Sequence, residues 1–196
     1  MTFTFIGLGN PGKEYENTRH NTGRMMLEYF RVAHDFPEWK ADKKSQALIS
    51  KGKIGSHSTT LVCPETFMNK SGISARVFAT NAKSAERMLV VYDDLDLPFG
   101  SAKISFNKSS GGHKGLESII KAVKTQAFPR MRIGISPSTP KGKIKKPQGD
   151  EAVEKKILGD FNTDELTALK KLSKRTNEAL EIFVREGCES AMTAFN

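Results

Sequence analysis

The feature that most constrains the fold is a repeated succession of short apolar runs and helical stretches along the first 136 residues. Between the apolar runs, apolar residues recur at three- and four-residue spacing, as they do on the buried face of a helix. We expect strands at residues 3–8, 59–63, 88–92, 102–106 and 131–135, and helices from Arg24, from Ser71 and over 116–123. This alternation predicts a three-layer α/β sandwich, in which helices cover both faces of a twisted mixed sheet.

The last third of the chain has a different composition. Residues 137–149 are rich in Pro, Gly and Lys, which predicts a mobile basic loop; its lysines are Lys141, Lys143, Lys145 and Lys146. Residues 150–196 are expected to form the C-terminal helices. Asn162, with Glu165 three positions later, predicts the capped start of a long helix that Gly187 ends. With no internal repeat and no convincing domain boundary, we expect one domain over 1–196.

Charge and cysteine content limit the class of protein. Lys and Arg number 31 against 22 Asp and Glu, a net charge of +9, so polyanions such as nucleic acid are the first partners to consider; a basic solvated surface is the alternative. The apolar runs reach only about five residues, against roughly 20 for a bilayer span, and residues 1–10 lack an export signal. Two cysteines, Cys63 and Cys188, cannot form a disulfide framework. A cytoplasmic protein that does not span a membrane is expected.

Gly7, Gly9 and Gly12 match the dinucleotide fingerprint Gly-x-Gly-x-x-Gly directly after a predicted strand. That fingerprint requires the third glycine to open a helix that holds the pyrophosphate. Here Pro11 and residues 13–21 show no helical periodicity, which disfavours a nicotinamide or flavin site. No Gly-Lys pair is followed by Ser or Thr, so a P-loop is absent from the sequence as well. We therefore expect no cofactor.

The four histidines divide into two pairs by local context. None of them stands at metal-ligand spacing from another, so no metal is expected. His34, near a helix end, and His57, in a polar segment, are expected at the surface. His20 and His113 lie in polar, glycine-flanked loops, where α/β folds place their functional side chains.

Four segments carry a more specific signal: GLGNPGKEYENTRHN at 7–21, ETFMNKSG at 65–72, VVYDDLDLPFG at 90–100 and GGHKGLESI at 111–119. In order and spacing they resemble the signature segments of bacterial peptidyl-tRNA hydrolases. The resemblance spans about the first 136 residues, and the C-terminal helices match the family in length and position. It implies a metal-independent, monomeric esterase that cleaves the bond between a peptide and the 3′ ribose of tRNA, so that tRNA from stalled translation is recycled.

The resemblance implies roles for two side chains in the chemistry. His20 is the expected base that takes a proton from the attacking water, a task that suits an imidazole with an ordinary pKa of about 6.5. Asp93 is its expected partner, fixing the imidazole tautomer and stabilising the imidazolium. Asp94 and Asp96 are not expected to share this role.

Further residues are expected at the substrate. Asn10 and Asn69 match family asparagines that hold the substrate and the water, since an amide can donate to a carbonyl and accept from a peptide N–H. Their amides could also stabilise the oxyanion. Met68 matches an apolar wall of the cleft, and Tyr15, His113 and Lys114 complete the expected substrate-binding set.

Lys114 departs from the family, which has asparagine after the glycine-glycine-histidine segment. Lysine can only donate hydrogen bonds. If Lys114 points into the cleft, it would oppose protonation of His20 and His113 and lower their pKa values, or stabilise an oxyanion. If it points outward, it could meet a phosphate.

The family also implies a basic grip on the tRNA. Lys103 and Arg132 occupy the expected places near two strands. A second basic position, two residues after Lys103, is Ser105 here, so the grip on the tRNA is either rebuilt from Lys108 or weakened.

Three function classes follow. A hydrolase needs His20, Asp93, Asn10 and Asn69, all of which are present. A non-enzymatic RNA-binding relative would keep the fold and the basic surface, and Lys114 is the one residue in its favour. A dinucleotide-dependent oxidoreductase would carry a cofactor visible by absorbance.

Overall fold

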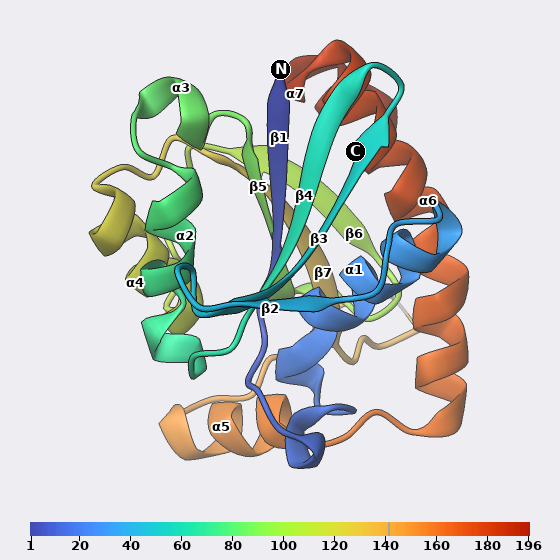
Figure 1. Ribbon diagram of the computed structural model, residues 1–196. Coiled ribbons are helices and arrows are strands. Elements are labelled where there is room, and N and C mark those ends of the chain that lie inside the picture. The colour runs from blue at the N-terminus through green and yellow to red at the C-terminus, as the bar shows by residue number, and fades with distance from the viewer. Residues whose placement is uncertain (141) are drawn as a thin grey trace.

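The computed structural model describes residues 1–140 and 142–196. Its centre is a seven-stranded sheet in the order β2-β3-β4-β1-β5-β7-β6 (Figure 1). The strands are β1 (Thr2–Gly7), β2 (Lys40–Asp42), β3 (Ala47–Ile54), β4 (His57–Pro64), β5 (Met88–Pro98), β6 (Ala102–Phe106) and β7 (Pro129–Ser136). β4, β1, β5 and β7 pair in parallel, whereas β2, β3 and β6 pair antiparallel. The predicted mixed sheet is confirmed.

Helices cover both faces of this sheet, as predicted (Figure 1). The apolar cluster on one face packs α1 (Thr22–Ala33), α6 (Thr163–Glu186) and α7 (Cys188–Phe195) against residues such as Phe5 and Val91. The cluster on the other face packs α2 (Gly72–Phe78), α3 (Ala82–Ala85) and α4 (Lys114–Val123) against Ile6 and Val90. Neighbouring residues of β1 and β5 thus point to opposite faces, which explains their continuous apolar sequences.

Short helices complete the chain. The 3₁₀ turns are η1 (Lys13–Tyr15), η2 (Arg19–Asn21) and η3 (Met68–Lys70), and α5 (Asp150–Leu158) buries none of its residues.

The long helix α6 begins at the predicted cap. The Asn162 side chain accepts from the backbone N–H of Glu165, and the Glu165 carboxylate accepts from the backbone N–H of Asn162. Gly187 ends α6 with a φ of 95°, as predicted.

The glycine fingerprint has a packing explanation. A Cβ on Gly7 would lie 2.5 Å from the carbonyl oxygen of Gly23, and one on Gly23 would lie 2.2 Å from that of Val91. These two glycines let α1 approach β1 and β5 closely. Gly12 is followed by the single turn η1 rather than by an α-helix. The local structure therefore lacks the helix N-terminus that a dinucleotide pyrophosphate requires.

Three sequence expectations were wrong in detail. β5 continues to Pro98 instead of ending at Tyr92, because β7 pairs with it beyond that point. His34 is half-buried with its ring 4.2 Å from that of Phe30, and His57 is half-buried at the start of β4. Both histidines use their apolar ring faces for packing.

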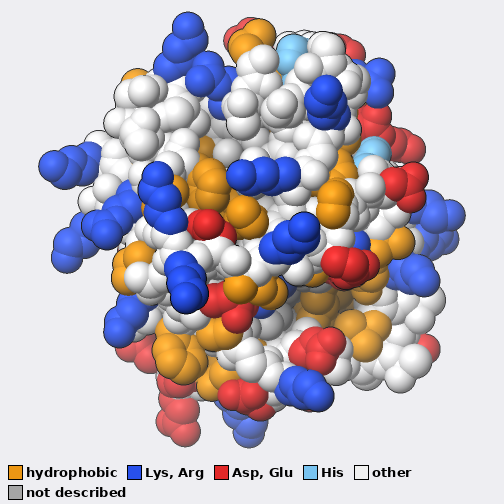
Figure 2. All heavy atoms as spheres, in the orientation of Figure 1, with side chains coloured by type: hydrophobic (Ala, Val, Ile, Leu, Met, Phe, Trp, Pro, Cys, Tyr) orange, Lys and Arg blue, Asp and Glu red, His pale blue; other side chains and the backbone are white. Residues whose placement is uncertain are grey.

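The surface is predominantly basic over part of the molecule. Lys and Arg side chains project along the left side of Figure 2, where Figure 1 places α2, α3 and α4. In the basic loop, the Lys146 ammonium pairs with the Asp96 carboxylate at 2.6 Å, whereas Lys141 lies outside the described residues. Within the described part of the chain, no helix has the length and apolar character needed to cross a bilayer.

Candidate active site

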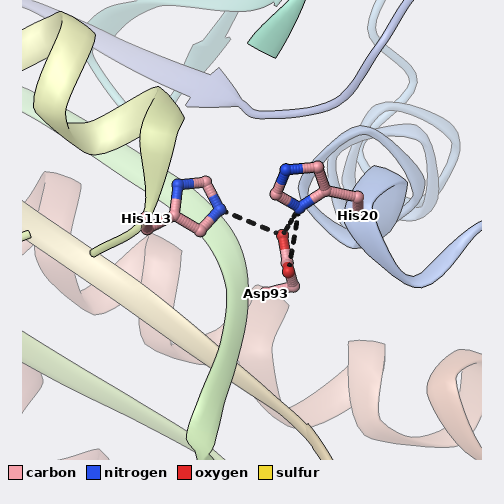
Figure 3. Close-up of side chains that lie close together, drawn as sticks. All are labelled: His20, Asp93 and His113. Atoms are coloured by element: carbon pink, nitrogen blue, oxygen red, sulfur yellow. Dashed lines mark hydrogen bonds and ion pairs between the residues drawn. The ribbon is translucent and has the colours of Figure 1, made fainter. Parts of the chain in front are cut away.

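The carboxyl ends of β1, β4 and β5 meet at one edge of the sheet, and the site lies there. His20 comes from η2, after β1, and Asp93 comes from β5. Nδ1 of His20 lies 3.0 Å from each carboxylate oxygen of Asp93 (Figure 3). Both side chains are buried, with exposed fractions of 7% and 2%. The structure therefore pairs the predicted base and its predicted partner.

A second imidazole reaches the same carboxylate. Nε2 of His113 lies 3.1 Å from Oδ1 of Asp93, on the side opposite His20 (Figure 3). His113 is also the N-cap of α4, where its Nδ1 accepts hydrogen bonds from the backbone N–H groups of Gly115 and Leu116 at 3.2 and 3.3 Å. Asp93 is thus held between two histidines that come from opposite sides of the sheet.

Burial and charge act in opposite directions on the pair. Burial opposes the protonation of His20, but the charge of Asp93 and its hydrogen bond outweigh burial and raise the pKa of His20 above its ordinary value. Burial also opposes the ionisation of Asp93, yet the neighbouring His20 and His113 hold its pKa well below the ordinary range. Asp93 is therefore ionised near neutral pH, and His20 Nδ1–H donates to it, which leaves Nε2 as the basic nitrogen.

Asn10 is oriented by three hydrogen bonds. Its side-chain oxygen accepts from the backbone N–H of Met68 at 2.8 Å. Its backbone N–H donates to the side-chain oxygen of Asn21, whose amide nitrogen donates to the Asn10 carbonyl. Because the Asn10 oxygen is occupied, its amide N–H₂ is the group left for a ligand.

The other expected substrate residues differ in their exposure. Met68 is buried at 4%, and α4 presses on it so closely that a Cβ on Gly115 would lie 2.5 Å from its sulfur. Tyr15, in η1, is half-buried, and Asn69, in η3, is exposed. Met68 is thus buried beside Asn10, and its role as an apolar wall of the cleft stays a prediction.

Lys114 is the first residue of α4, and its side chain is exposed. The charge that shifts the pKa of His20 is that of Asp93, and the net shift is upward. This is opposite to the shift expected if the ammonium entered the cleft. The exposed side chain of Lys114 favours the outward alternative, and its effect on the site stays a prediction.

Two of the residues expected to grip tRNA lie on β7 and β6, the two strands next to β5. Lys103 on β6 pairs directly opposite Arg132 on β7. Nε of Arg132 donates to the Asp94 carboxylate at 2.8 Å, and the Tyr92 hydroxyl donates to the same oxygen. Lys103 is exposed and Arg132 is half-buried, so both can reach an external anion.

Lys108 and Ser105 differ in their surroundings. The Lys108 side chain is exposed, whereas its carbonyl accepts from the buried Arg130 guanidinium. Ser105 is buried and pairs opposite Arg130 on β7. Lys108, rather than Ser105, is thus available to an external anion.

Sequence reasoning missed three residues that support the site. Asn21 orients Asn10; Arg130 holds the segment before α4 through the carbonyls of Lys108 and Ser109. Arg19 donates to the Gly159 carbonyl and pairs with the Glu165 carboxylate, which ties η2 to the start of α6. Arg19 and Asn21 flank His20 in the first signature segment, and this adjacency was the available signal. Arg130 carried none, because its hydrogen bonds all go to backbone carbonyls, which leave no pattern in the sequence.

Among the described residues, His20, Asp93 and His113 are the group whose ligand atoms, all within 4.8 Å of one another, come close enough for a metal ion. Their hydrogen bonds oppose that use. Coordination through Nε2 of His113 would move its proton to Nδ1, which faces two backbone N–H donors. The donor set therefore fits a proton-bound arrangement better than a metal centre.

Comparisons with known proteins give a consistent result. A family model described as Peptidyl-tRNA hydrolase matches residues 4–196. The peptidyl-tRNA hydrolase of Herpetosiphon aurantiacus is 40% identical over 196 residues, which cover 99% of this chain and 90% of that protein. The enzyme of that name from Aquifex aeolicus is 39% identical, covering 97% of this chain and 94% of its own. The crystal structure of peptidyl-tRNA hydrolase from Acinetobacter baumannii matches with a TM-score of 0.86 at 30% identity, covering 100% of this chain and 94% of that one.

Proposed function

The chain belongs to the peptidyl-tRNA hydrolase family, and from this premise we propose that His20 and Asp93 carry its reaction. That reaction is hydrolysis of the ester bond between peptide and tRNA, which returns tRNA to translation. The observation that supports this assignment is the buried hydrogen-bonded pair of His20 and Asp93. An oxidoreductase is not supported, because neither the family nor the segment after β1 fits one.

His20 acts on the water. With Nδ1–H donated to Asp93, Nε2 accepts a proton from a water molecule as its oxygen attacks the ester carbonyl. The ionised Asp93 stabilises the resulting imidazolium and keeps the ring oriented. The imidazolium then gives its proton to the 3′ oxygen of the tRNA as the ester bond breaks. Peptide carboxylate and tRNA hydroxyl are the products, and His20 returns to its neutral form.

Asn10 and Asn69 bind the reacting ester. The side-chain oxygen of Asn10 is occupied by Met68, so its amide N–H₂ is oriented as a donor toward the carbonyl oxygen. Such a donor stabilises the oxyanion of the tetrahedral intermediate. The exposed Asn69 amide and the half-buried Tyr15 contact the peptide, and Met68 excludes water beside it.

The tRNA binds through its phosphates. The exposed Lys103 and Lys108 and the half-buried Arg132 supply cations at the β6–β7 end of the sheet. The Asp94 carboxylate holds Arg132 by its Nε and leaves its terminal nitrogens for a phosphate. One chain carries every residue invoked, so the site needs no second subunit, and we propose that the enzyme acts as a monomer. Its two free cysteines suit the cytoplasm.

The test is release of peptide from an N-blocked aminoacyl-tRNA. His20→Ala removes the base, and its kcat falls by about 10²–10⁴. Its fold and tRNA affinity stay near those of the wild type, because the tRNA contacts lie elsewhere. His34→Ala, which removes a half-buried histidine at the end of α1, is the matched control. More than half the wild-type rate in His20→Ala would refute the assignment.

A further inference from the structure

We propose that His113 is a positioning residue that holds Asp93, rather than a contact for the substrate; this inference rests on the proposed function of the His20–Asp93 pair. An imidazole has only two nitrogens for hydrogen bonding. Nδ1 of His113 is bonded to the backbone of Gly115 and Leu116, and Nε2 to Asp93. Neither nitrogen is left for the substrate while these contacts persist.

The start of α4 sets the protonation of this ring. Nδ1 can accept from the backbone N–H groups of Gly115 and Leu116 only when it carries no proton. The positive end of the helix dipole also disfavours a proton there. The proton therefore lies on Nε2, where it is donated to Oδ1 of Asp93. The helix cap thus fixes the tautomer of His113, with its N–H on Nε2 and directed at Asp93.

This donor has two effects on Asp93. Together with Nδ1 of His20, it fixes the carboxylate from two sides at 3.0 and 3.1 Å. It also takes up part of the carboxylate's negative charge, which reduces the charge available to stabilise the His20 imidazolium. Loss of the His113 donor alone should therefore raise the pKa of His20 and leave the carboxylate less well oriented.

The neighbouring groups leave Asp93 as the charge that acts on His20. Besides the pair and His113, the titratable or charged side chains on β5, β7, α4 and η2 are Tyr92, Asp94, Asp96, Arg130, Arg132, Lys114, Glu117, Lys121 and Arg19. Asp96 pairs with Lys146, and Arg130 donates to the backbone carbonyls of Lys108 and Ser109. Asp94 pairs with Arg132 and accepts from Tyr92; Arg19 pairs with Glu165. Lys114 is exposed.

Two conservative variants separate the two contacts of His113. In His113→Asn, the amide oxygen can replace Nδ1 as the helix cap, but the side chain is too short to reach Asp93. In His113→Gln, the amide nitrogen can replace Nε2 as the donor to Asp93, but the cap is lost. His34→Asn is the control for a histidine exchange away from the site.

The two variants are expected to lose different properties: His113→Asn loses activity, and His113→Gln loses stability. His113→Asn keeps its Tm near that of the wild type, while kcat falls, by up to about 10²-fold, at unchanged KM. His113→Gln has a higher kcat than His113→Asn but a lower Tm than the wild type. A raised KM with unchanged kcat in His113→Asn would instead identify a substrate contact and overturn the proposal.

An NMR titration of His20 tests the same inference without substrate. The midpoint of the His20 ring resonances moves to higher pH in His113→Asn and stays closer to the wild-type value in His113→Gln. An unchanged or lowered midpoint in His113→Asn would overturn the proposal. If the wild type released no peptide from tRNA, the proposed function would fail, whereas this titration would still decide the contact between His113 and Asp93.

Discussion

Asp93 is the residue on which the proton chemistry of the site depends. Its carboxylate is almost fully buried and accepts from His20 and His113, so its negative charge is directed at two rings rather than at solvent. Burial alone would lower the pKa of His20, and Asp93 reverses that direction. Activity is therefore predicted to rise with pH along an acid limb above the ordinary histidine value, since the base must be neutral.

Asp93→Asn should separate the effect of burial on the pKa of His20 from the effect of the Asp93 charge. Burial of His20 remains and the negative charge is gone, so the pKa of His20 falls below its ordinary value and the acid limb moves to lower pH. At the same time kcat falls, by about 10²–10⁴, because the amide can hold the imidazole in the wrong tautomer. The measurement is a pH–rate profile of both proteins. A defect confined to KM, or an acid limb at higher pH, would contradict this role of Asp93.

Asn10→Asp tests the amide donor. The new carboxylate keeps an oxygen for the Met68 N–H, so stability should change little, but it replaces the N–H₂ group with an acceptor. We expect kcat on the pH plateau to fall by about 10²–10³, the effect of losing one oxyanion donor. Asn10→Ala, which also abandons the Met68 N–H, should lower the Tm as well. A wild-type kcat for Asn10→Asp would remove Asn10 from the oxyanion site.

At the scale of elements, sequence patterns predicted the structures that form from local signals. β1, β4, β5, β6 and β7 have apolar runs or alternation, and α6 has its capping box. β3 was missed because its apolar residues do not alternate cleanly and two lysines stand in its second half; pairing with β4 makes it a strand. β2 and α3, of three and four residues, are too short to show a period.

The cap of α6 connects an element's stability to the site. Asn162 and Glu165 form a capping box, and the same Glu165 carboxylate pairs with Arg19, next to His20. We expect Asn162→Ala to lower the free energy of unfolding by about 0.5–2 kcal/mol, measured by urea denaturation. Asn81→Ala, in the capping box of the four-residue α3, is the matched control and should cost less because fewer residues depend on that cap. Equal losses of unfolding free energy in the two variants would show that the effect of a cap does not depend on the length of its helix.

At the scale of the molecule, the site depends on the topology and not on any one segment. Asn10, His20, Met68, Asp93 and His113 lie up to about a hundred positions apart, and the parallel order of β4, β1 and β5 brings them to one edge. Family resemblance pointed to these residues, but periodicity and spacing could not show that Asp93 would have two imidazole partners. The protonation of His113 in particular follows from its place at the start of α4, which only the fold reveals.

The net charge of +9 predicts that the affinity for tRNA depends on salt concentration. Each phosphate contact releases counterions, so the affinity for tRNA should fall with salt at a logarithmic slope of about −0.7 to −0.9 per contact. Lys103→Ala and Arg132→Ala should each reduce that slope by roughly one contact. Lys171→Ala, an exposed lysine on α6 at the opposite face of the sheet, is the control and should leave the slope unchanged. Arg132→Ala should lower the affinity more than Lys103→Ala does, because it leaves the Asp94 carboxylate without its partner beside the phosphate. Binding curves over a series of salt concentrations give both quantities. If Lys171→Ala changed the slope as much as Lys103→Ala, the tRNA would be held by general charge and not by the β6–β7 end of the sheet.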